Sequence, residues 1–177
     1  MVKHVLDTKM YGLMLKPKKL TKMWNITAYT DSNWADDKQT RISVAGYVLY
    51  FCGVAVAWKS KGMKHVTLSL SEAELVALSE CMKFVMKIVQ DLGLELQRPV
   101  TVRVHNVGAM FLVENATTTQ RTRHIDIRYK WVSEFIENRD VEIVFVKTAE
   151  NDADIFTKNV SGDLNKRHVK QMMHLED

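Results

Sequence analysis

Hydrophobic and polar residues alternate along the chain with two different periods, which separate predicted strands from predicted helices. Short runs of β-branched and aromatic residues bounded by turn residues predict strands. Apolar residues recurring at steps of three and four predict helices. The predicted strands are residues 24–29, 43–51, 54–59, 100–104 and 141–146, and the predicted helices are residues 69–92, 109–115, 125–138 and 151–158.

The order of these segments predicts an α/β domain built on one mixed sheet. The first three strands are joined by short connections, including a tight turn at Cys52-Gly53, and therefore form an antiparallel meander. The later strands are reached through helices, which places helices on the faces of the sheet. The polar and charged residues from Ser161 onward predict a poorly ordered C-terminal tail.

The longest predicted helix carries its own start and stop signals. Ser69 and Glu72 have the spacing of a capping box, as do Ser71 and Glu74, and Gly93 is a typical helix end. Glu74 falls on the apolar stripe, whereas Glu72 falls on a face that we expect to be solvated. A carboxylate on a core-facing stripe costs free energy unless it is paired or bound to a metal.

Composition narrows the class of protein. The 177 residues are 46% hydrophobic with a net charge of +4, which suits one folded domain and excludes a disordered chain. No apolar run approaches the roughly 18 residues of a membrane span, and the first ten residues lack the apolar core of a signal peptide. Two cysteines, Cys52 and Cys81, make no disulfide framework, so we expect an intracellular protein of the cytoplasm or nucleus.

Three carboxylates on separate predicted elements form a candidate metal site. Asp31 follows the first strand, Glu74 lies on the long helix, and Asp154 lies near the start of the last helix. Carboxylates that converge from different elements suit Mg²⁺, and two such ions can activate a water and stabilise a leaving oxygen. The pattern also allows a plain structural interpretation, in which Glu74 caps its helix and Asp154 favours a helix N-terminus.

Several motifs resemble one known family, the RNase H domain of copia-type LTR retrotransposon polyproteins. The matching stretches, in order, are YTDSNWADD (29–37), SVAGYVLYF (43–51), AWKSKG (57–62), LSLSEAELVALSE (68–80), RTRHIDIRYKWV (121–132) and NDADIFTKNV (151–160). The resemblance implies an RNase H-like fold, a five-stranded mixed sheet of order 3-2-1-4-5 flanked by helices. It also divides the chain into residues 1–23, resembling the link to reverse transcriptase, a domain over 24–160, and a tail over 161–177.

The resemblance implies cleavage of RNA in RNA–DNA hybrids by an Asp, Glu, Asp, Asp set around two Mg²⁺ ions. Asp31, Glu74 and Asp154 match three of these positions, but the third Asp is replaced by His105 in Val104-His105-Asn106. Imidazole supplies one nitrogen and no negative charge, whereas Mg²⁺ prefers oxygen and Mn²⁺ tolerates nitrogen better. We therefore expect catalysis to be lost or strongly reduced, unless a neighbouring carboxylate compensates: Asp126, Glu150 or Asp152.

Basic residues are the candidate nucleic-acid contacts. Family resemblance points to Lys59 and Lys61 and to the cluster Arg121, Arg123 and His124, although the two lysines also suit ordinary turn positions. The expected partner is an RNA–DNA hybrid or another nucleic acid, and no membrane. Three hypotheses remain: an active two-metal ribonuclease H with Mg²⁺ or Mn²⁺, a catalytically dead relative that needs no metal and binds nucleic acid or a protein, and a decayed element copy.

Overall fold

The computed structural model describes residues 12, 15, 23–36, 39–106, 108 and 123–173. A five-stranded sheet lies at its centre in the order β3-β2-β1-β4-β5, which confirms the predicted fold class. Its strands are β1 (Ile26–Asn33), β2 (Val44–Phe51), β3 (Val54–Gly62), β4 (Val100–Val104) and β5 (Val141–Phe145). Within these described ranges, no helix is both long and apolar enough to cross a membrane.

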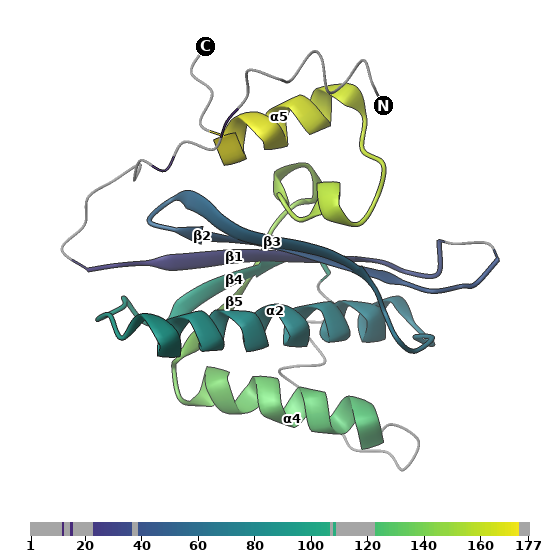
Figure 1. Ribbon diagram of the computed structural model, residues 1–177. Helices are drawn as coiled ribbons and strands as arrows, with labels where there is room; N and C mark the ends of the chain where they lie inside the picture. The colour runs from purple at the N-terminus through teal and green to yellow at the C-terminus, as the bar shows by residue number, and fades with distance from the viewer. Residues whose placement is uncertain are drawn as a thin grey trace.

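The sheet is mixed, as the short and long connections predict. β1 pairs with β2 and β2 pairs with β3 in antiparallel fashion, whereas β4 pairs in parallel with β1 and with β5. Figure 1 shows helices α2 (Leu70–Leu92) and α4 (Arg123–Glu137) on one face of the sheet, and the short helix η3 (Asp154–Phe156) and helix α5 (Gly162–Met173) on the other.

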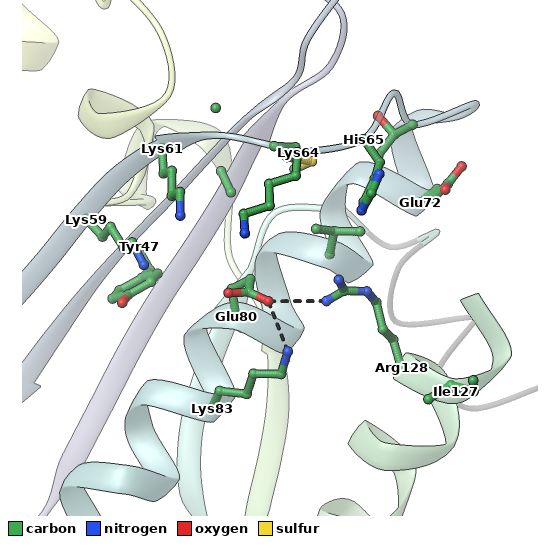
Figure 2. A pocket seen from close by; sticks show the side chains of 15 residues that line it. Tyr47, Lys59, Lys61, Lys64, His65, Glu72, Glu80, Lys83, Ile127 and Arg128 are labelled. Atoms are coloured by element: carbon green, nitrogen blue, oxygen red, sulfur yellow. Dashed lines mark hydrogen bonds and ion pairs between the residues drawn. The ribbon is translucent and has the colours of Figure 1, made fainter. Parts of the chain in front are cut away.

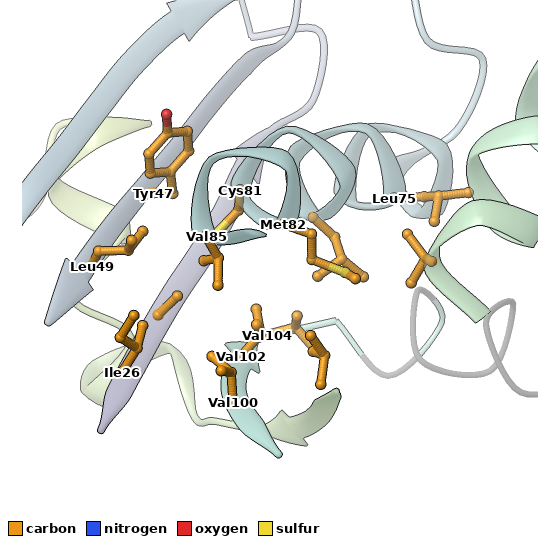
Figure 3. Packing of buried hydrophobic residues seen from close by; sticks show 14 of the residues in the cluster. Ile26, Tyr47, Leu49, Leu75, Cys81, Met82, Val85, Val100, Val102 and Val104 are labelled. Atoms are coloured by element: carbon orange, nitrogen blue, oxygen red, sulfur yellow. The ribbon is translucent and has the colours of Figure 1, made fainter. Parts of the chain in front are cut away.

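The main core fills the space between the sheet and α2. Figure 3 shows Leu75, Met82 and Val85 of α2 facing apolar side chains of the strands, among them Leu49 and Val102. All five side chains are at most 1% exposed. Each fully buried side chain of this kind stabilises the fold by roughly 1.5–3 kcal/mol, so the apolar stripe fixes the rotation of α2 over the sheet.

Helix α2 begins and ends where the sequence predicts. The backbone N–H of Glu72 donates to Ser69 Oγ at 3.1 Å, and Gly93 ends the helix in a left-handed conformation with φ of 58°. Glu72 accepts a hydrogen bond from the backbone N–H of Leu68 at 2.7 Å and is only 6% exposed. The expectation that Glu72 is solvated is therefore wrong, because its carboxylate closes the cap.

Two strands run further than predicted. β1 continues past Asp31 to Asn33 because Asp31, Ser32 and Asn33 pair with residues 46, 45 and 44 of β2. β3 continues to Gly62, so that Lys61 belongs to the strand and not to the turn after it. Polar side chains hide these extensions from a pattern that searches for apolar residues.

The C-terminal part differs most from the predictions. Residues 151–158 contain the single short turn η3 in place of a longer helix. The predicted poorly ordered tail contains helix α5, which packs against the sheet through the buried residues His168 and Met172. His168 Nδ1 donates to Asp152 Oδ1 at 2.7 Å, and this buried contact anchors a helix whose surface is otherwise polar. The predicted helix over 109–115 and almost all of the lead-in over 1–23 lie outside the described residues.

Candidate active site

Asp31 and His105 lie together at the point where β1 and β4 diverge. The last parallel pair between these strands is Thr30 with Val104; Asp31 is the next residue of β1, and His105 directly follows β4. The geometry of the sheet therefore places His105 beside the first catalytic candidate, as the motif alignment predicts for the third Asp of the family.

Glu74 reaches the same end of the sheet from the first turns of α2. Its carboxylate Oε1 accepts a hydrogen bond from the backbone N–H of Ser32 at 3.3 Å. Glu74 is 3% exposed and Asp31 is 1% exposed. The stripe that buries Leu75 and Leu78 thus also carries Glu74 inward, at the end of the helix where the apolar core gives way to the polar end of β1.

Asp154 is held against β1 by the buried side chain of Asn151. Asn151 Nδ2 donates to the Thr30 carbonyl at 3.1 Å, and Asn151 Oδ1 accepts from the Ala153 backbone N–H at 3.2 Å. This second contact closes a short side-chain turn just before η3, which itself has no side-chain cap. Asp154, at the start of η3, is 1% exposed.

A glycine in β2 makes the close approach of this segment possible. Gly46 is the residue paired with Asp31. A Cβ atom at Gly46 would lie 2.6 Å from Thr157 Cγ2 and 2.9 Å from Phe156 Cβ, which is too close for real atoms. The missing side chain lets the Thr157 hydroxyl reach Asp31 and donate to its Oδ2.

Lys158 supplies positive charge between two of the carboxylates. Its Nζ lies 3.3 Å from Asp31 Oδ2 and 3.4 Å from Asp154 Oδ1, and its side chain is 34% exposed. Burial lowers the pKa of Lys158, but Asp31 and Asp154 together outweigh it, so that the pKa is raised. Sequence analysis missed this residue, although its i,i+4 spacing from Asp154 was a signal.

Burial and mutual repulsion make the acidic site hard to ionise. Burial first and the charge of Asp31 second raise the pKa of Glu74 to about 8. The same two causes, in the same order, raise the pKa of Asp154 to about 6. Lys158 partly offsets both shifts. The folded protein therefore holds protons that the unfolded chain would release at neutral pH.

The donor set fits a hard cation in part. Asp31 Oδ1 and Glu74 Oε2 are buried and accept no hydrogen bond, which leaves one oxygen on each of these two carboxylates for another cation, whereas the buried Asp154 Oδ1 faces Lys158 Nζ at 3.4 Å. Among the described residues, however, no group of three or more Asp, Glu, His or Cys side chains is arranged closely enough to hold a metal ion. The carboxylate oxygens are therefore buried ligands of the kind that a hard cation prefers, but the ammonium of Lys158 already lies against Asp31 and Asp154.

His105 makes its hydrogen bonds with residues that follow β5. Its Nδ1 lies 3.3 Å from the Val146 carbonyl oxygen, and the Thr148 hydroxyl lies 2.9 Å from Nε2. Because a carbonyl oxygen only accepts, Nδ1 donates and Nε2 remains the basic nitrogen. His105 thereby ties the end of β4 to residues that follow β5, and its basic nitrogen already has a partner.

The three carboxylates that were considered as substitutes lie elsewhere. Asp152 accepts from the Tyr50 hydroxyl at 2.6 Å and from His168, on the α5 side of the sheet. Glu150 is exposed on the short helix η2 (Thr148–Glu150), and Asp126 lies on α4. None of these positions brings a carboxylate into the contacts described for Asp31, Glu74 and Asp154.

The predicted nucleic-acid contacts are placed only in part. Lys59 and Lys61 are exposed on β3 and line a cavity of about 600 Å³ beside α2 and α4. Arg121 lies outside the described residues. Arg123 and His124 begin α4, but their side chains are not among the described parts of the structure. Arg128, on α4, lines the same cavity.

Comparisons with known proteins agree with this architecture. No family model matches the chain. The retrovirus-related Pol polyprotein from transposon TNT 1-94 of Nicotiana tabacum is 37% identical over 138 residues, which are 76% of this chain and 10% of the polyprotein. The corresponding polyprotein from transposon RE1 of Arabidopsis thaliana is 30% identical over 163 residues, or 90% of this chain and 11% of the polyprotein.

Solved structures show the same fold. LC11-RNase H1, solved in complex with an RNA/DNA hybrid, superposes with a TM-score of 0.58 at 14% identity, covering 75% of this chain and 94% of that chain. The present chain spans about a tenth of the length of the curated relatives it matches. It is a homologue of one segment of the retrovirus-related Pol polyproteins of plant transposons, and that segment has an RNase H-like fold.

Proposed function

We propose that this chain is an RNase H-like nucleic-acid-binding domain of copia-type retrotransposon origin, which binds RNA–DNA hybrids and has lost most of its catalytic rate. The observation that carries the proposal is the identity of residue 105. At the divergence of β1 and β4, where the family places a carboxylate, this chain has an imidazole bonded to Val146 and Thr148.

Charge explains why this substitution reduces catalysis. Asp31, Glu74 and Asp154 would hold Mg²⁺ or Mn²⁺ if the domain is active, and a bound ion would activate water and stabilise the leaving oxygen. His105 removes one unit of negative charge from that set, and Lys158 neutralises another. A site with so little net negative charge binds two divalent cations poorly, and each ion lost costs several kcal/mol of transition-state stabilisation.

Hybrid cleavage tests the catalytic part of the proposal. The natural protein, His105→Asp and Asp31→Asn would be compared on a labelled RNA–DNA hybrid with Mg²⁺ and, separately, with Mn²⁺. We expect little cleavage by the natural protein with Mg²⁺, partial recovery with Mn²⁺, and a gain of at least tenfold in His105→Asp. Robust Mg²⁺-dependent cleavage by the natural protein, abolished in Asp31→Asn, would refute the loss of catalysis.

Anisotropy titrations test the binding part. We expect hybrid affinity that falls as salt rises, because lysine and arginine contacts to phosphates release counter-ions. Hybrid, duplex and single strands would each be titrated at several salt concentrations. If none of them binds, the domain is not a nucleic-acid-binding module, and the alternative of an exapted protein-interaction module takes its place.

An active two-metal ribonuclease H is the second candidate. It is favoured by two buried carboxylate oxygens that accept no hydrogen bond, Asp31 Oδ1 and Glu74 Oε2. Buried acceptors without donors are rare in folded proteins, and a bound ion is one of the explanations for them. The cleavage assay above distinguishes the two candidates directly, since the active enzyme needs no change at position 105.

A further inference from the structure

The cavity beside α2 is separate from the acidic site and has a basic rim. Figure 2 shows the side chains of Lys59, Lys61 and Lys64 extending from the β3 side, with Lys83 and Arg128 approaching from the two helices. Its volume of about 600 Å³ is within the range of roughly 300–1,000 Å³ that small-ligand sites have.

The charges of the rim are unbalanced. Five basic residues line the cavity against two acidic ones, Glu72 and Glu80, with His65 in addition. Glu80 is paired with Lys83 at 3.0 Å and with Arg128 at 3.3 Å (dashed in Figure 2). No ion pair joins Lys59, Lys61 or Lys64 to any residue in the described part of the chain, so three positive charges face the cavity uncompensated. Such a rim favours an anion.

The wall of the cavity is apolar. Tyr47, Met63 and Val76 line it together with Ile127, whose side chain is 68% exposed. Inside a duplex, the bases face each other and offer a protein surface mostly phosphates and sugars. An unpaired nucleotide offers both a phosphate and an apolar base face, which is the combination that single-strand sites recognise with basic and aromatic side chains.

We propose that this cavity binds one unpaired nucleotide, with its phosphate among Lys59, Lys61 and Lys64 and its base against the wall formed by Tyr47 and Val76. The proposal rests on the proposed function, because it assumes that nucleic acid is the partner. It adds that the domain prefers a hybrid carrying a single-stranded extension. A free nucleotide has the same phosphate and base, so the ligand of the cavity is either a nucleotide at the end of a strand or a free nucleotide.

The position of the cavity on α2 agrees with such an arrangement. Glu72 lines the cavity, and Glu74, two residues further along α2, contacts β1 in the acidic site. The two sites therefore share the first turns of one helix.

The test compares a blunt hybrid with the same hybrid carrying a single-stranded extension of a few nucleotides. For the natural protein, we expect the extension to tighten binding about fivefold or more, as stacking of one base typically does. The double change Lys61→Gln with Lys64→Gln, and the cavity-filling change Val76→Phe, should each remove this gain. Lys166→Gln, an exposed position on α5 across the sheet, is the matched control and should keep it.

Experiments with free nucleotide test whether the cavity also binds a nucleotide that is not part of a strand. Millimolar adenosine monophosphate should abolish the gain from the extension and leave blunt-hybrid affinity unchanged, and calorimetry should detect its binding to the natural protein but not to Val76→Phe. Circular dichroism checks that each variant is folded. If Val76→Phe does not fold, the double variant Lys61→Gln with Lys64→Gln is used alone for the test. A glutamate-rich peptide that competes as well as the nucleotide would overturn the nucleotide assignment in favour of a protein ligand.

Failure of this inference can be told from failure of the proposed function. If the blunt hybrid binds but the extension adds nothing, or if the gain survives in both cavity variants, the cavity is not a nucleotide site and hybrid binding stands. If no hybrid binds, the proposed function fails. Calorimetry with the free nucleotide then tests the cavity independently of the hybrid. Nucleotide binding by the natural protein that is lost in Val76→Phe supports the site, and absence of nucleotide binding overturns it.

Discussion

Glu74→Gln provides the sharpest test of the electrostatics of the acidic site. The pKa of Glu74 rises from 4.5 to about 8, first because the carboxyl is buried and second because Asp31 lies nearby. At about 1.4 kcal/mol for each pKa unit, this rise corresponds to about 5 kcal/mol, and we expect about 2–4 kcal/mol in solution because water and counter-ions relax the site.

The direction of the pH effect follows from proton binding. Between pH 4.5 and about 8, the folded protein keeps the proton of Glu74 while the unfolded chain has released it. The free energy of unfolding therefore falls as pH rises through this range, and the full cost is present above the folded pKa. Asp154, with a pKa raised from 3.8 to about 6, acts in the same direction at lower pH. A glutamine releases no proton and can still accept from the Ser32 backbone N–H.

Urea unfolding followed by circular dichroism, from about pH 5 to about pH 9 with a chelator present, measures this effect. We expect the free energy of unfolding of Glu74→Gln to exceed that of the natural protein by about 2–4 kcal/mol near pH 9. This difference should become smaller as the pH falls toward about 5. Glu95→Gln, at an exposed position, should follow the natural protein at every pH. A difference between the Glu74 variant and the natural protein that is independent of pH would refute the reasoning.

Three further changes test the contacts around the site. Lys158→Met should lower the free energy of unfolding by about 1–2 kcal/mol near pH 8 and by less near pH 5, measured by urea unfolding, because a partly exposed partner of buried carboxylates is lost. His168→Ala should cost about 2–4 kcal/mol by the same measurement and expose the amides of α5 to hydrogen exchange, because Asp152 loses a buried partner. Gly46→Ala should cost about 1–3 kcal/mol in thermal unfolding and displace Thr157, because its Cβ has no room.

Local sequence patterns predicted the helix α2 and the five strands, because each signal that they depend on lies within a few residues of sequence. The apolar stripe of α2, the cap at Ser69 and the end at Gly93 are all local, and all three are confirmed. Glu74 was singled out because a carboxylate on that stripe needs a partner, and its side chain does turn inward to the backbone of Ser32. Five strands in the right order followed from the same local evidence and from the family resemblance.

Contacts that a residue makes outside its own helix or strand account for what the patterns missed. Glu72 looked solvated because the helix was treated alone, whereas its carboxylate bonds to the residue before the cap. Helix α5 looked like a tail because most of its residues are polar, and only the buried contact of His168 with Asp152, 16 residues earlier, explains its docking. The pairing of Lys158 with Asp154 has a local i,i+4 spacing, but its contact with Asp31 crosses 127 residues of sequence and no local pattern contains it.

His105 and Lys158 act on one quantity, the net charge available to a divalent cation. A fourth carboxylate would leave the ammonium of Lys158 a minor partner among four negative charges, easily outweighed by the attraction for metal. With His105 in place, Lys158 pairs with Asp31 and Asp154, and the raised pKa values of Glu74 and Asp154 reduce the ionised fraction of these two carboxyls near neutral pH. The acidic site is then balanced by one internal cation and by bound protons, which is why we expect the domain to remain stably folded without a bound metal ion.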